Sequence, residues 1–133
     1  MKPLEDLDIE QLSQECFRIS SEHGFQDAFA PTSAAISEKL MLAVGELAEA
    51  QEELRKGLLP EVVYSVRDGQ TFMFANLAAY DGVDKPEGFG IELVDAVIRI
   101  LDLMAALDLP VRELFAAKMR FNEGRPYLHG KAF

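Results

Sequence analysis

The chain has 133 residues, 49% of them hydrophobic, which is typical of one domain whose core needs no disulfide. Its formal net charge of −10 argues against binding of a nucleic acid polymer, because such binding draws on clustered Lys and Arg. Small phosphorylated ligands stay compatible with this charge, since a divalent cation can join them to acidic side chains.

The sequence lacks features that are typical of secreted and membrane proteins. Acidic residues occupy the segment MKPLEDLDIE, where a secretory signal would have a basic start and an apolar run. A single cysteine, Cys16, has no internal partner, and the apolar region 91–107 is interrupted by charged residues. We therefore expect a cytoplasmic chain without a membrane span.

Turn residues divide the chain into helical stretches, and we expect one all-α domain over 1–133, a bundle of four to five helices. The first helix begins near Asp8 and ends near Gly24. The second begins near Pro31 to Ser33 and ends at Gly57. Its helically spaced apolar residues predict one buried stripe: Ile36, Leu40, Ala43, Val44, Leu47 and Leu54.

The second half of the chain begins with a connector, about 58–90, that we expect to be irregular except for a short helix or helical turn over Thr71 to Tyr80. A third helix over about 91–107 is apolar nearly all round, which predicts burial by several neighbours or by a second subunit. Asp108 as N-cap and Pro110 in the first turn predict a last helix, followed by an irregular tail from about residue 123.

Acidic residues lie at helical spacing on two of these helices. Glu92, Asp95, Arg99 and Asp102 fall at i, i+3, i+7 and i+10, so they form one narrow strip on the third helix. On the second helix, a face beside the apolar stripe carries Glu46, Glu49 and Glu53. If these faces pack together, the carboxylates repel each other unless a cation intervenes, and Mg²⁺ or Mn²⁺ prefers such oxygen ligands.

Two alternatives stay open for these acidic residues. Both faces are solvent-exposed in the first, as is usual for charges on a helix. In the second, Arg99 forms an internal salt bridge with Asp95 or Asp102. A zinc site has no support, because Cys16 is alone and neither His23 nor His129 has a ligand partner at helical spacing.

The densest basic segment lies at the end of the sequence. If the last helix continues far enough, it presents Lys118, Asn122 and Arg125 on one face, at i, i+4 and i+7. Tyr127, His129 and Lys131 follow. This mixture of cations and an amide suits a polyphosphate and its sugar or base. The alternative is a helix end whose cations complement the macrodipole, followed by a disordered tail.

Three segments together resemble the MazG-like branch of the all-α nucleoside triphosphate pyrophosphohydrolases: EKLMLAVGELAEAQEELRKG, GFGIELVDAVIRILDLMAALDLP and KMRFNEGRPYLHGKAF. They cover about residues 36–57 and 88–133. The family motif E-x-x-E followed by E-x-x-D corresponds to Glu46, Glu49, Glu92 and Asp95. One departure is the 42 residues between Glu49 and Glu92, which exceed the connection common in the family.

The resemblance implies a helical bundle assembled as a homodimer or homotetramer, with Mg²⁺ held by the four carboxylates and phosphates contacted by Lys118 and Arg125. It implies that water attacks between the α and β phosphorus atoms, releasing a nucleoside monophosphate and pyrophosphate. Glu46 or Glu53 is the candidate to orient or deprotonate that water. Two other classes of function stay open: a non-catalytic helical interaction module, and a sensor that binds nucleotide or metal without hydrolysis.

Overall fold

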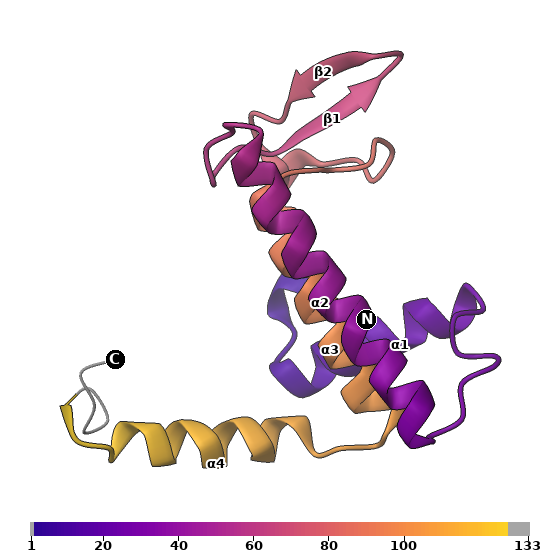
Figure 1. The fold of residues 1–133 in the computed structure, drawn as a ribbon, viewed down its shortest axis with the longest axis vertical. Helices are drawn as coiled ribbons and strands as arrows, with labels where there is room; N and C mark the ends of the chain where they lie inside the picture. The colour runs from indigo at the N-terminus through magenta and orange to yellow at the C-terminus, as the bar shows by residue number, and fades with distance from the viewer. Residues whose placement is uncertain (1, 128–133) are drawn as a thin grey trace. The chain divides into compact units, whose positions relative to one another are not determined.

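The computed structural model describes residues 2–127, which are mostly helical and include one small antiparallel sheet. Contacts divide the chain into two compact units: residues up to Phe29 together with those from Leu101 onward, and Ala30–Ile100. The elements, labelled in Figure 1, are η1 (Leu4–Asp6), α1 (Ile9–Glu22), α2 (Ser33–Arg55), β1 (Tyr64–Arg67), β2 (Gln70–Met73), η2 (Leu77–Ala79), α3 (Phe89–Ala106) and α4 (Val111–Glu123). Among the described residues, none of the helices combines the length and the apolar content that a membrane span requires.

The first two helices begin and end where the sequence predicts. Asp8 caps α1 by accepting a hydrogen bond from the backbone N–H of Gln11 at 2.8 Å, and the Gln11 side chain accepts one from the Asp8 N–H. Thr32 caps α2 through the N–H of Ala35 at 3.2 Å. Gly24 and Gly57 follow the two helices with positive φ angles, the backbone conformation that commonly ends a helix.

The unit that contains α1 and α4 has its own small core. Cys16, Leu101 and Val111 are buried there, and a buried hydrogen bond of 2.6 Å joins the Ser13 hydroxyl to the carbonyl oxygen of Leu101. At the edge of the unit, Arg112 forms an ion pair of 2.7 Å with Asp8. Cys16 is therefore a packing residue of this core.

The prediction that Asp108 caps the last helix is wrong. Asp108 has a φ of 54°, and the N–H groups of Asp108 and Leu109 donate to the carbonyls of Ala105 and Met104 at 3.0 and 2.9 Å. This pattern ends a helix with one residue in the left-handed region, which aspartate tolerates better than most residues. Asp108 thus terminates α3, and α4 begins after Pro110 without a side-chain cap.

In the other unit, α2 and the part of α3 up to Ile100 lie side by side and run in opposite directions (Figure 1). The predicted buried stripe of α2 is wrong for its large residues, because Leu40, Val44 and Leu47 are each 50% exposed. Ala43 of the predicted stripe is buried, and so are Ala50 and Glu53 on α2 and Glu92 and Ala96 on α3.

The third helix is partly uncovered in the single chain, and its predicted burial by a second subunit stays a prediction. Val94 is 51% exposed and Val97 is 49% exposed, so α3 is not covered on all sides within the single chain. Helix α3 therefore carries apolar surface that the single chain does not bury.

The connector contains a β-hairpin, and of the short helix or helical turn predicted over Thr71 to Tyr80 only a helical turn is present. Asp68 and Gly69 have φ angles of 50° and 76°, and they form the two-residue turn between Arg67 and Gln70. Two consecutive positive φ angles give the turn geometry that best matches strand twist, and Asp-Gly is its common sequence. Within the predicted range, the helical part is the single 3₁₀ turn Leu77–Ala79.

The hairpin is fastened to both neighbouring helices. The Tyr64 hydroxyl donates to the carboxylate oxygens of Glu53 on α2, at 2.8 and 3.0 Å. The backbone of Tyr64 also pairs with Glu87, two residues before α3 begins. Next along the chain, Gly88 has a φ of 134°, and a β-carbon there would collide with the carbonyl oxygen of Val62.

Gly88→Ala is expected to destabilise the protein by about 2–3 kcal/mol, because alanine adds backbone strain and a collision with Val62. The matched variant is Gly45→Ala, in the middle of α2, where an added β-carbon meets nothing within 4 Å. That change should stabilise by about 0.5–1 kcal/mol. Urea unfolding measures both, and equal effects would contradict the close approach at Gly88.

Candidate metal centre

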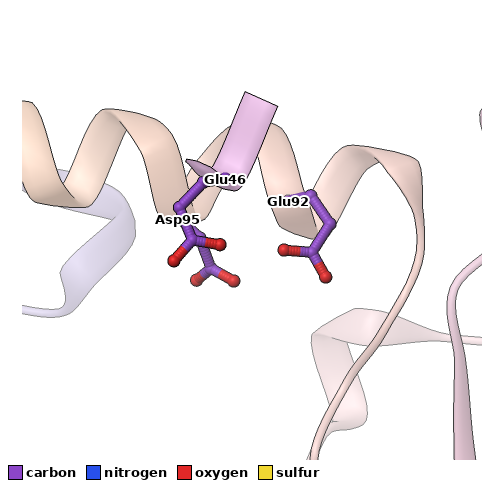
Figure 2. A group of neighbouring side chains, drawn as sticks. All are labelled: Glu46, Glu92 and Asp95. Carbon is purple, nitrogen blue, oxygen red and sulfur yellow. The ribbon is translucent and has the colours of Figure 1, made fainter. Parts of the chain in front are cut away.

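Three of the four carboxylates predicted to bind metal lie together in the unit Ala30–Ile100. Glu46 comes from α2, while Glu92 and Asp95 lie one turn apart on α3. Each offers an oxygen such that the three oxygens are within 4.8 Å of one another. Figure 2 shows the three carboxylate groups on the same side of α3. The two acidic helix faces therefore meet, as the spacing of their residues predicts.

Glu92 is the most unusual member of this group. Only 7% of the residue is exposed, and its buried Oε2 has no hydrogen-bond partner. Burial, reinforced by the neighbouring carboxylates of Glu49 and Glu46, raises the pKa of Glu92 to about 7. A buried polar oxygen without a partner is costly, and a proton or a cation relieves that cost.

The pKa of Asp95 is shifted in the same direction as that of Glu92. Burial raises the pKa of Asp95, and the negative charge of Glu46 adds to this effect. The charges of Arg99 and Lys85 oppose it. The local electrostatics thus combine crowded negative charges with two nearby cations.

Glu49, the fourth predicted ligand, is exposed on α2 one turn after Glu46. It lies near enough to Glu92 to contribute to the raised pKa of that residue. It does not belong to the group of oxygens that lie within 4.8 Å of one another among the described residues. Its role as a ligand stays a prediction.

Arg99 pairs with a residue on the facing helix. Its Nε donates to Glu46 Oε1 at 2.7 Å, so the salt bridge joins α3 to α2. Burial acts to raise the pKa of Glu46, but this hydrogen bond and the arginine charge lower it overall.

The salt bridges expected from Arg99 to Asp95 or Asp102 are replaced by this contact. Asp102 instead accepts hydrogen bonds from Ser20 and Gln26, each at 2.9 Å. The reason is geometric, because the Arg99 guanidinium reaches across to the facing helix and not along its own.

Glu53, a candidate for orienting water, is 5% exposed and holds the hairpin. Both of its carboxylate oxygens accept hydrogen bonds from the Tyr64 hydroxyl. Lys56 donates to the same carboxylate at 3.2 Å. The sequence carries no local signal for this pairing, because Tyr64 lies in the connector, 11 residues beyond Glu53.

The predicted substrate-binding residues lie on or after α4, in the other compact unit. The predicted common face is interrupted, because α4 ends at Glu123 and only Lys118 and Asn122 are helical. The Lys118 ammonium and the Arg125 guanidinium nevertheless both approach the ring of Phe121, at 5.0 and 5.5 Å. Tyr127 is 91% exposed, whereas His129 and Lys131 lie outside the described residues.

No protein-family model, curated protein or solved structure matches this chain. The chemistry of the site therefore has to be argued from its own residues. Three convergent carboxylates offer hard oxygen donors, which suit Mg²⁺ or Mn²⁺ better than softer metals.

The pKa of Glu92 predicts a pH dependence of stability for the metal-free protein. A carboxylate with a pKa near 7 in the folded state and 4.5 when unfolded stabilises the fold fully below about pH 4.5. That stability, about 3 kcal/mol, is lost as the pH rises through 7. Glu92→Gln removes the titrating group, so the variant should gain stability over wild type between pH 5 and 8. Urea unfolding in a chelator measures it, and parallel pH profiles would contradict the assignment.

Proposed function

We propose that this chain is a Mg²⁺-dependent, cytoplasmic hydrolase that converts (deoxy)nucleoside triphosphates to monophosphates and pyrophosphate. The observation that carries the proposal is the buried, unpartnered oxygen of Glu92 beside the carboxylates of Glu46 and Asp95. A structural salt-bridge cluster would pair that oxygen, whereas a cation site leaves it available for a ligand. The resemblance of the sequence to MazG-like proteins supports the same reading and suggests removal of surplus or non-standard nucleotides.

The residues present fit a hard divalent cation. Glu46, Glu92 and Asp95 would hold it, and Glu49 is close enough to Glu92 to complete the set proposed from the sequence. When bound, Mg²⁺ neutralises charge on phosphate oxygens and makes coordinated water more acidic. Mn²⁺ has the same ligand preference and is expected to substitute for it.

In the proposed reaction, a water oxygen attacks the α-phosphorus and the bond from this phosphorus to the α,β-bridging oxygen breaks. The leaving group is pyrophosphate, and the proton of the water passes to a carboxylate or to solvent. Of the two residues considered for orienting the water, Glu46 belongs to the acidic group and Glu53 is bound to Tyr64. We therefore assign the water-orienting role to Glu46 and a structural role to Glu53.

A homodimer or homotetramer is part of the proposal. Large apolar residues at helical spacing are exposed on both helices of the site, including Leu40, Val44 and Leu47 on α2 and Val94 and Val97 on α3. Monomeric proteins rarely expose such stripes, and a second copy would cover them.

Pyrophosphate release from a panel of ribo- and deoxynucleoside triphosphates with Mg²⁺ tests the reaction. Glu92→Gln and Asp95→Asn should each lower the rate at least about a hundredfold, because each removes a proposed ligand. Glu38→Gln, on the exposed surface of α2, removes a carboxylate outside the group and should retain activity.

If the wild type binds Mn²⁺ but releases no pyrophosphate from any nucleotide of the panel, catalysis is ruled out and a metal or nucleotide sensor remains. Full activity of both site variants would exclude the metal role. If the chain is an interaction module without a metal site, the wild type will bind Mn²⁺ no better than the Glu92→Gln variant does.

Sedimentation velocity tests the assembly. Wild type should sediment as a dimer or tetramer, and Leu40→Glu together with Val97→Glu should shift it toward the monomer, because buried charge disfavours association. Gln70→Glu adds one negative charge at the exposed hairpin turn and should leave the assembly intact. A wild-type protein that is monomeric at tens of micromolar would contradict this part of the proposal.

A further inference from the structure

Three carboxylates do not by themselves decide which hard cation binds. Glu46, Glu92 and Asp95 offer oxygen ligands, and such ligands suit Ca²⁺ as well as Mg²⁺ and Mn²⁺. Mg²⁺ requires near-octahedral geometry at about 2.0–2.1 Å, whereas Ca²⁺ takes about 6–8 oxygens at longer distances and accepts both oxygens of one carboxylate. The number of oxygens that each carboxylate can offer therefore affects the choice of ion.

The carboxylate of Glu46 is held by an arginine on the facing helix. Arg99 Nε donates to its Oε1 at 2.7 Å, a length typical of a hydrogen bond between charged groups. The two residues are 53 positions apart in the sequence, and the bond joins α3 to α2. One of the two oxygens of Glu46 is thus bonded to a cation of the protein before any metal binds.

The surroundings of Glu46 restrict its carboxylate further. Ala43, Glu46 and Ala50 follow helical spacing on one face of α2, and both alanines are buried. The Glu46 side chain is itself only 12% exposed, whereas that of Arg99 is 41% exposed. The carboxylate therefore has little freedom to turn, and the arginine that holds it extends to solvent.

The hydrogen bond from Arg99 makes the two oxygens of Glu46 unequal as metal ligands. An ion that takes both oxygens comes next to the guanidinium at Oε1, where two cations repel each other. An ion that takes a single oxygen leaves the hydrogen bond intact. Arginine suits this role because its guanidinium stays charged at physiological pH.

We propose that Arg99 restricts Glu46 to one metal-binding oxygen and thereby lowers the affinity of the site for Ca²⁺ relative to Mg²⁺. Arg99 is a positioning residue in this inference, because it acts on the ion through Glu46. The inference rests on the proposed function for the metal site formed by Glu46, Glu92 and Asp95. It does not depend on the hydrolysis of nucleotides.

The test is the affinity of the full chain for Mg²⁺ and for Ca²⁺, each measured by displacement of Mn²⁺ and the electron paramagnetic resonance of the released ion. In Arg99→Gln, the ratio of the Ca²⁺ affinity to the Mg²⁺ affinity should rise about tenfold over wild type, because a residue that orients a metal ligand is lost. Arg99→Lys keeps a charged donor, and its ratio should stay within about threefold of wild type.

The matched control is Arg55→Gln. This change removes an arginine at the exposed end of α2, where the side chain pairs with Glu52 at 3.7 Å. The arginine is lost outside the acidic group, so the ratio should equal that of wild type.

The ratio separates the positioning role from other effects of the substitution. Loss of the arginine charge favours the binding of both ions, and this effect cancels because each ion carries the same charge. A damaged fold weakens both affinities in parallel. A change in the way Glu46 coordinates the ion alters the ratio itself.

A ratio in Arg99→Gln within about twofold of that in Arg55→Gln would overturn the inference, including the case in which both affinities fall together. An Arg99→Lys variant shifted as strongly as Arg99→Gln would also overturn it, because a charged donor would then not control the ratio. A wild type that binds neither ion would overturn it as well.

Failure of this inference is distinguishable from failure of the proposed reaction. A wild type that releases no pyrophosphate, in a protein whose Arg99→Gln variant shows the shifted ratio, retains the inference and loses the reaction. A wild type that hydrolyses nucleotides while Arg99→Gln keeps the ratio of Arg55→Gln retains the reaction and loses the inference.

Discussion

The burial of Glu92 is the constraint on which the structure of this unit depends. Glu92 is 7% exposed, and Ala43 and Ala50 on α2 and Ala96 on α3 are buried in the same unit. The Glu92 Oε2 is without a hydrogen-bond partner, which is costly for a buried polar atom. A proton or a cation would satisfy this oxygen, and the raised pKa of Glu92 favours its protonated form in the metal-free chain.

The hairpin determines where α3 begins and thereby where Glu92 lies. Tyr64 is bonded to Glu53 through its hydroxyl and to Glu87 through its backbone, so one residue joins the end of α2 to the start of α3. The contact of Gly88 with Val62 leaves no space for a side chain at this junction. Glu53 does not belong to the acidic group. It acts on the site through Tyr64, which it holds at the start of α3.

Local signals predicted a large part of this fold, and tertiary contacts decided the rest. Asp8 and Thr32 mark helix starts because capping depends on neighbouring residues alone, and the helical spacing of Glu46, Glu92 and Asp95 brought them into one group. Asp68-Gly69 is also a local signal, since this dipeptide is typical of a two-residue hairpin turn. The pairings of Arg99 with Glu46 and of Tyr64 with Glu53 could not be predicted, because each joins elements whose relative register the sequence does not specify.

The net charge of the chain is a poor guide to the chemistry of this site. At the acidic group, negative charge is opposed locally by the guanidinium of Arg99, by the charge of Lys85 and by the raised pKa of Glu92, which favours its neutral form. Under the proposed function, a divalent cation would take the place of the proton, because it binds the ionised form of the same carboxylates. Metal binding would then be coupled to the folding of this unit, since a ligand that binds only the folded state stabilises it.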